Sequence, residues 1–153
     1  MNNTIHSSDD FEGMRKAGNL AASTLDLLVE KVKPGVSTEE LDNIAFDYIV
    51  RHGGLIAPLF YKGYPKSVCT SINHVICHGI PSSRILENGD IVNIDVTVIV
   101  DGWHGDTSRM FPVGKINAKA QKLIDCTFHA MHEGINAAPV SYTHLTLPTT
   151  MWV

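Results

Sequence analysis

Asp95 and Asp106 are the two residues of this sequence best placed to do chemistry together. Between them stands Asp101-Gly102, the strongest signal for a β-hairpin in the chain. If Asp101-Gly102 forms a two-residue turn, Asp95 pairs with Ser108 and Thr97 pairs with Asp106. Paired residues share a face of the sheet, and side chains alternate along each strand. All four side chains are therefore expected to project from one face.

This placement suits a pair of divalent metal ions. Asp95 and Asp106 would be diagonal neighbours with Cα atoms about 7–8 Å apart. Carboxylates at that separation can lean together onto two metal ions spaced about 3.5–4 Å apart. Burying two unpaired carboxylates costs free energy, so the pair needs a metal, another cation or water. The pattern alone leaves open a second reading, a solvated outer face on which aspartate and threonine are ordinary.

The surrounding pattern predicts an α+β fold, with helices over one face of an antiparallel sheet. Apolar residues at helical spacing predict helices over residues 9–32 and 117–137, and a further helix between Ser37 and Gly53-Gly54. Ser8 is the predicted N-cap of the helix over residues 9–32, and Ser37 is the predicted N-cap of the helix that ends at Gly53-Gly54. Strand-like runs cover residues 55–59, 68–72, 75–77, 91–100 and 103–113. The apolar face of the strand over 91–100, opposite Asp95, is expected to pack against the helices.

Composition excludes several classes of protein. The chain has 153 residues, 44% of them hydrophobic and 18% charged, with a net charge of −4. These values are typical of a globular protein and not of a disordered chain or a coiled coil. A pI near 6.0 gives no support for nucleic-acid binding. Three cysteines without a Cys-x-x-Cys motif, and no signal-like or membrane-spanning segment, predict reduced thiols and a cytoplasmic location.

Several longer strings carry a specific resemblance. They read GYPKSVC at 63–69, VICHGIP at 75–81, GDIVNIDV at 89–96 and DGWHGDTS at 101–108. Together they resemble type I methionine aminopeptidase, over about residues 9–137. The resemblance implies a pita-bread fold of two related halves, and removal of the initiator methionine from nascent proteins. It also implies a site with two divalent metal ions held by two Asp, one His and two Glu.

The resemblance assigns roles to residues of this chain. Asp95 would bind one metal ion through both carboxylate oxygens, and Asp106 would bridge the two. An oxygen-rich site with one imidazole suits Co, Mn, Fe or Zn. His78 would be the catalytic and substrate-binding histidine, donating a hydrogen bond to the scissile amide. The remaining matches are Tyr61, Tyr64 and Cys69, which would line the methionine pocket, and Asn73 with the backbone of Val75, which would bind a monovalent cation.

The resemblance covers only part of a catalytic domain. Residues 1–137 are interpreted as its N-terminal half, and residues 138–153 as an unrelated tail from a frameshift or an assembly artefact. The other three metal ligands belong to the family's second half, so the chain as given is expected to lack activity. The expected partner is the N-terminal Met of nascent polypeptides near the ribosome. Nucleic-acid and membrane binding are not expected, and members of the family are usually monomeric.

The residues are also compatible with other functions. A proline-specific peptidase of the same fold is one, although residues 77–81 (CHGIP) argue against it. A binding module that lost its catalytic site is another, but such modules typically lose the ligand aspartates. A third is an orphan half-domain that dimerises. His104 shares strand parity with Asp106, so it either lies near the site or is an ordinary strand residue.

Overall fold

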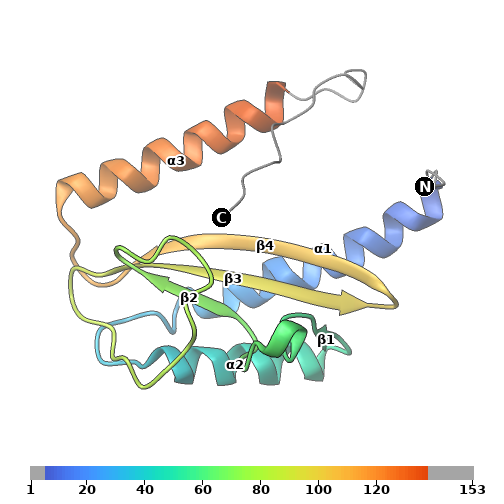
Figure 1. Cartoon of the computed structure of the whole chain (residues 1–153). Coiled ribbons are helices and arrows are strands. Elements are labelled where there is room, and N and C mark those ends of the chain that lie inside the picture. The colour runs from blue at the N-terminus through green and yellow to red at the C-terminus, as the bar shows by residue number, and fades with distance from the viewer. Residues whose placement is uncertain (1–5, 138–153) are drawn as a thin grey trace. The chain divides into compact units, whose positions relative to one another are not determined.

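The computed structural model describes residues 6–137, which divide into two units, 6–116 and 117–137. Figure 1 shows their elements. The first unit contains α1 (Ser8–Leu28), α2 (Thr38–Arg51), β1 (Leu55–Ile56), the 3-10 turn η1 (Tyr61–Gly63), β2 (Cys69–Ile72), β3 (Ile91–Val100) and β4 (Trp103–Pro112). The second unit consists of the helix α3 (Ala118–Ala137). The predicted tail lies outside the described residues.

The long hairpin forms with the predicted register. β3 and β4 are antiparallel, with Asp95 opposite Ser108 and Thr97 opposite Asp106. Asp101 and Gly102 both have positive φ angles, 51° and 85°, as the favoured two-residue hairpin turn requires. The local twist of that turn matches the twist of the strands, so the pairing runs without a bulge along their full length.

β3 lies in the middle of the sheet (Figure 1). Because β4 pairs with all of β3, the short strands β1 and β2 share its other edge. β2 places Cys69 directly opposite Asp95. The apolar side of β3 is fully buried in one core with residues of α1 and α2. Its members on β3 are Val92, Ile94, Val96 and Val98. The predicted α+β arrangement, with helices on one face, is therefore confirmed for this unit.

Several predicted elements differ from the structure. The strand predicted over residues 55–59 is limited to Leu55–Ile56, because the chain bends and turns from residue 57 onward. The N-cap of α1 is Ser7 rather than Ser8, because Ser7 and Asp10 form a reciprocal capping box. The helix ends at Leu28, although Val32 is buried and so continues the apolar pattern beyond it. Residues 75–77 form no strand. Asn73 turns the chain away with a φ of 52°, and its side-chain oxygen accepts the Ile91 N–H that another strand residue would have paired with.

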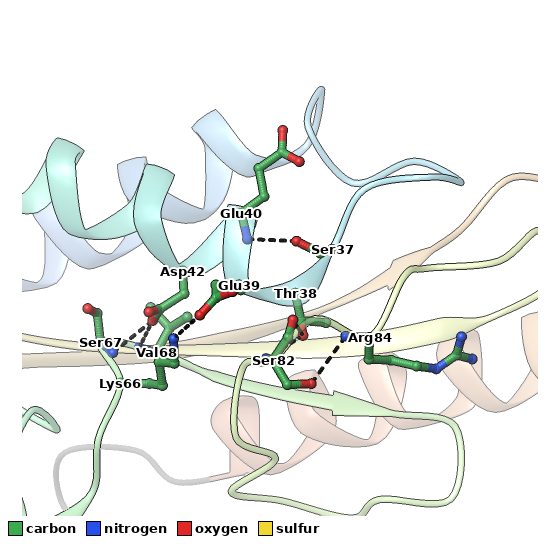
Figure 2. Close-up of polar contacts among 10 residues, drawn as sticks. All are labelled: Ser37, Thr38, Glu39, Glu40, Asp42, Lys66, Ser67, Val68, Ser82 and Arg84. Atoms are coloured by element: carbon green, nitrogen blue, oxygen red, sulfur yellow. Dashed lines mark hydrogen bonds and ion pairs between the residues drawn. The ribbon is translucent and has the colours of Figure 1, made fainter.

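The N-terminus of α2 is fastened to the loop that precedes β3 (Figure 2). Ser37 caps the helix as predicted, accepting from the Glu40 N–H. The Thr38 hydroxyl donates to the Ser82 carbonyl at 3.0 Å and accepts from the Ser82 N–H at 2.9 Å. These contacts fix the second helix relative to the sheet. None of the helices within residues 6–137 is long and apolar enough to cross a membrane.

α1 crosses β4 at a point of close backbone approach. Gly105 is buried there, and a Cβ added to it would lie 2.2 Å from the backbone of Ala17. No side chain fits at such a distance, so the helix can lie this low on the strand only over a glycine. Gly18, the next residue of the same helix, has open space around it.

The two glycines give a matched test of this packing. We expect Gly105→Ala to lower the free energy of unfolding by about 1–3 kcal/mol, because α1 must lift from the sheet. Gly18→Ala is expected to raise it by about 0.5–1 kcal/mol, because alanine favours the helix. Urea unfolding followed by circular dichroism measures both. Equal stabilities of the two variants would contradict the close approach.

Candidate metal and substrate cleft

A cleft of about 870 Å³ opens over the outer face of the sheet. It brings together all the residues predicted to bind the divalent metals and the substrate. These are Tyr61, Tyr64, Cys69, His78, Asp95 and Asp106. Four different segments therefore converge on one hollow: the η1 turn, β2 with the loop that follows it, β3 and β4. Their sequence separation shows that the site depends on the fold of the whole first unit.

The two aspartates interact across the hairpin. The Thr97 hydroxyl donates to Asp106 Oδ1 at 3.1 Å. Burial raises the pKa of Asp95, the negative charge of Asp106 raises it further, and His78 acts in the opposite sense. Within residues 6–137, no group of three or more His, Cys, Asp or Glu side chains is arranged to hold a metal ion. The pair is thus a concentration of negative charge that a cation would stabilise, but it supplies only part of a coordination shell.

Tyr64 and Cys69 form an inner wall of the cleft. Tyr64 is half-buried, and its hydroxyl lies 3.0 Å from the Val68 carbonyl and 3.2 Å from the Gly79 carbonyl. Burial raises the pKa of Tyr64 far above its usual range, and burial also raises the pKa of the Cys69 thiol. Both groups are therefore uncharged at neutral pH. A neutral, partly aromatic wall suits an apolar side chain.

His78 lies in the loop after β2, at the mouth of the cleft. The residue is exposed, and its φ angle is 56°, in the left-handed region that few residues other than glycine adopt. Such backbone strain is common where a side chain must be aimed for function. The imidazole can act as a hydrogen-bond donor or acceptor there.

Asn73 and Val75 do not reach this cleft. They line a separate cavity of about 230 Å³. The Asn73 side-chain amide donates to Asp90 Oδ1 at 2.8 Å, and its oxygen accepts from the Ile91 N–H. The side chain of Asn73 therefore joins the turn after β2 to the start of β3. Its backbone carbonyl is not used in these contacts.

Comparison with known proteins now decides the family. The model of metallopeptidase family M24 matches residues 12–144. The chain belongs to metallopeptidase family M24. Metallopeptidases of this family depend on divalent metal ions in general.

Within family M24, the chain is similar to methionine aminopeptidases. It is 57% identical over 131 residues to the methionine aminopeptidase of Rickettsia prowazekii (strain Madrid E), covering 86% of this chain and 51% of that protein. It is 54% identical over 131 residues to that of Escherichia coli (strain K12), covering 84% and 50%. A crystal structure of methionine aminopeptidase from Rickettsia prowazekii matches with a TM-score of 0.85 and 57% identity, over 86% of this chain and 53% of that chain.

These matches confirm the predicted pita-bread fold, of which the chain has the first-half arrangement. They also favour the methionine aminopeptidase resemblance over the proline-specific alternative. The chain spans about half the length of the curated relatives it matches.

The cleft of this M24 chain contains residues that received no firm role from the sequence. His104 and Thr97 line it, next to Asp106. His104 lies two residues before Asp106 on β4, and because the hairpin is regular both side chains project from the same face of the sheet. Pro58, Lys62 and Ile80 complete part of the wall. Pro58 and Ile80 lie in loops and Lys62 lies in the short η1 turn, where no periodicity indicates which way a side chain points.

Asp42 is a further residue that the sequence pattern missed. Its buried Oδ1 accepts from the Ser67 N–H at 2.7 Å and from the Val68 N–H at 3.0 Å (Figure 2). These bonds fasten the segment between Tyr64 and Cys69 to α2. The available signal was its position, since Asp42 follows Leu41 on the buried face of the helix. Burial raises the pKa of Asp42. The hydrogen bonds from the backbone N–H groups of Ser67 and Val68 act in the opposite direction, but they only partly offset the effect of burial.

Asp42 can be tested with two substitutions. Asp42→Ala leaves two buried N–H groups without an acceptor, so we expect the free energy of unfolding at pH 7 to fall by about 2–4 kcal/mol. Asp42→Asn retains an oxygen at the same place and is expected to cost much less. Urea unfolding at pH 7 compares the two variants with wild type.

The pH dependence follows from the raised pKa. The folded state binds a proton at Asp42 more tightly than the unfolded chain does. The stability of wild type relative to Asp42→Asn should therefore fall as pH rises from about 3.9 through the raised pKa of the folded state. Unfolding free energies measured from pH 3.5 to 7 test this, and a relative stability that rises over that range would contradict it.

Proposed function

We propose that the protein of which this chain forms a part removes the N-terminal methionine from polypeptides by metal-assisted hydrolysis. The observation that carries this proposal is the cleft, where Asp95 and Asp106 adjoin a neutral wall built by Tyr64 and Cys69. High identity to methionine aminopeptidases supports the choice of substrate. We further propose that residues 1–137 are the first half of the catalytic domain and that residues 138–153 are a tail unrelated to it.

Asp95 and Asp106 are the proposed ligands of two divalent metal ions, Co, Mn, Fe or Zn. The fit rests on their chemistry, since two carboxylates crowd one partly buried face. When bound, such ions polarise a carbonyl and lower the pKa of water. Thr97 orients the Asp106 carboxylate by donating to one of its oxygens.

The other side chains of the cleft are proposed to bind and orient the substrate. Tyr61, Tyr64 and Cys69 accept the methionine side chain, because their ring faces and the neutral thiol exclude water from an apolar group. His78 donates an imidazole N–H to the scissile amide, which favours the negative charge that develops on its oxygen. Asn73, with the backbone of Val75, is proposed to form part of a structural monovalent-cation site in the loop before His78.

The partner in this proposal is the N-terminal Met of a nascent polypeptide near the ribosome, in the cytoplasm. The 153-residue chain alone is proposed to be inactive, because the resemblance requires one further His and two Glu as ligands. A metal pair held by two of five ligands binds weakly. The alternative, a half-domain that restores a site by dimerising, predicts turnover that rises with the square of chain concentration.

Turnover and metal binding are tested separately on the purified 153-residue chain. We expect no methionine release from a Met-Ala-Ser peptide with added Mn²⁺ or Co²⁺, beyond the release seen with the metal alone. Release abolished by Asp95→Ala would overturn the proposed inactivity. A sizing column run on the same sample would reveal the dimer of the alternative.

The second readout is paramagnetic broadening of backbone amide signals by Mn²⁺. We expect weak broadening centred on Asp95 and Asp106, reduced about tenfold or more in Asp95→Asn/Asp106→Asn. The matched control is Asp101→Asn, which removes a carboxylate from the turn of the same hairpin and leaves the cleft intact. Broadening that survives the double substitution would contradict the assigned ligands.

A further inference from the structure

The backbone of His78 needs an external constraint. Its φ of 56° is unfavourable for a residue with a Cβ, and its exposed side chain is not packed in the core. An unconstrained loop residue would relax to the common right-handed or extended conformations. The neighbouring segments must therefore hold His78 in place.

Gly79, the next residue, is seated directly on β2. Its N–H donates to the Ser71 hydroxyl oxygen at 3.1 Å, and its carbonyl accepts from the Thr70 N–H at 2.7 Å. A Cβ at Gly79 would lie 2.2 Å from the Thr70 carbonyl oxygen, so the two backbones are in close contact. These contacts between Gly79 and β2 fix the C-terminal side of His78 against the sheet.

The Tyr64 hydroxyl reaches the Gly79 carbonyl from the segment that precedes β2. Its hydroxyl lies within hydrogen-bonding distance of the carbonyls of both Val68 and Gly79. A hydroxyl has one proton, which these two acceptors share. Tyr64 thus links the segment before β2 to the loop after it. The backbone N–H of Val68 in turn donates a hydrogen bond to the Asp42 carboxylate.

We propose that Tyr64 is a positioning residue for His78, acting through its hydroxyl on the Gly79 carbonyl, in addition to lining the pocket with its ring. The connection runs from α2 through Asp42 and the Val68 peptide to Tyr64, and from there to Gly79. It holds the strained backbone of His78 so that the imidazole stays at the cleft. The value of this to catalysis rests on the proposed function, whereas the mechanical link does not.

The hydroxyl is suited to this task over a wide pH range. Burial raises the pKa of Tyr64 far above its usual range, so the phenol retains the proton that it donates. Tyr61 provides the comparison. It also lines the cleft, but its side chain is largely exposed, at 66%. Removing the hydroxyl from each tyrosine in turn separates the linking role from a general effect on the aromatic wall.

The test uses Tyr64→Phe and Tyr61→Phe in the full 153-residue chain labelled with ¹⁵N and ¹³C. In Tyr64→Phe we expect the Thr70 amide to exchange with solvent about 5–10-fold faster, because its acceptor on Gly79 is held less firmly. The three-bond HN–Hα coupling and the Cα shift of His78 should move away from left-handed values. Exchange at Ile94, in the core of β3, should stay unchanged. Tyr61→Phe should leave all of these signals as in wild type.

A second substitution checks the seat of Gly79. Ser71→Ala removes the acceptor of the Gly79 N–H, and we expect the Gly79 amide to exchange faster and the His78 signals to shift in the same direction as in Tyr64→Phe. Wild-type signals of His78 and Thr70 in Tyr64→Phe would overturn the proposal. Global loss of structure, or equal acceleration at Ile94, would also overturn it, because both indicate a general structural role.

These measurements use neither metal nor substrate. A chain without peptidase activity or Mn²⁺ binding therefore leaves the outcome for Tyr64 intact. A negative result for Tyr64 likewise leaves the proposed ligands Asp95 and Asp106 untouched.

Discussion

The pairing of β3 with β4 sets which side chains can meet in the cleft. A slip of one residue would turn every side chain of a strand to the opposite face, separating Asp95 from Asp106 and burying charge in the core. Two features prevent such a slip. Val92, Ile94, Val96 and Val98 are committed to the core on β3, and Gly105 on β4 is the residue over which α1 can lie. The helices on one face therefore determine the position of the carboxylates on the other.

The central position of β3 explains how chemically different groups converge. Asp95 has Ser108 across one edge and Cys69 across the other, so acidic residues and the neutral wall adjoin the same strand. The segments on either side of β2 are not paired as strands with β3. Individual hydrogen bonds hold them instead. Asp42 holds the segment before β2, Tyr64 joins it to Gly79 after β2, and the Gly79 carbonyl accepts from the Thr70 N–H of β2. A regular strand pair positions the carboxylates, whereas individual polar contacts position His78.

This difference explains what could be predicted from the sequence. The turn chemistry of Asp101-Gly102 and the alternation along residues 91–100 are local, and they predicted the register and the face shared by Asp95 and Asp106. Likewise, the capping residues and apolar spacing located the helices, with errors where a buried residue such as Val32 follows a helix end. Convergence of His78 and the tyrosines on that face was inferred from family resemblance, because their loops have no periodicity. Asp42 escaped notice because its partners, Ser67 and Val68, are distant backbone groups that no pattern of residue types reveals.

The packing of the core also determines the electrostatics of the cleft. Asp95 and Asp106 repel each other, and burial of Asp95 adds to the cost of its charge. This repulsion disfavours the fold, so the buried side of β3 and the packing of α1 on β4 must force the two carboxylates together. The register requires no metal and no ligand from elsewhere, since the turn and the apolar face suffice to set it. A cation that reaches the pair therefore meets carboxylates already aligned, and relieves a repulsion that folding has created.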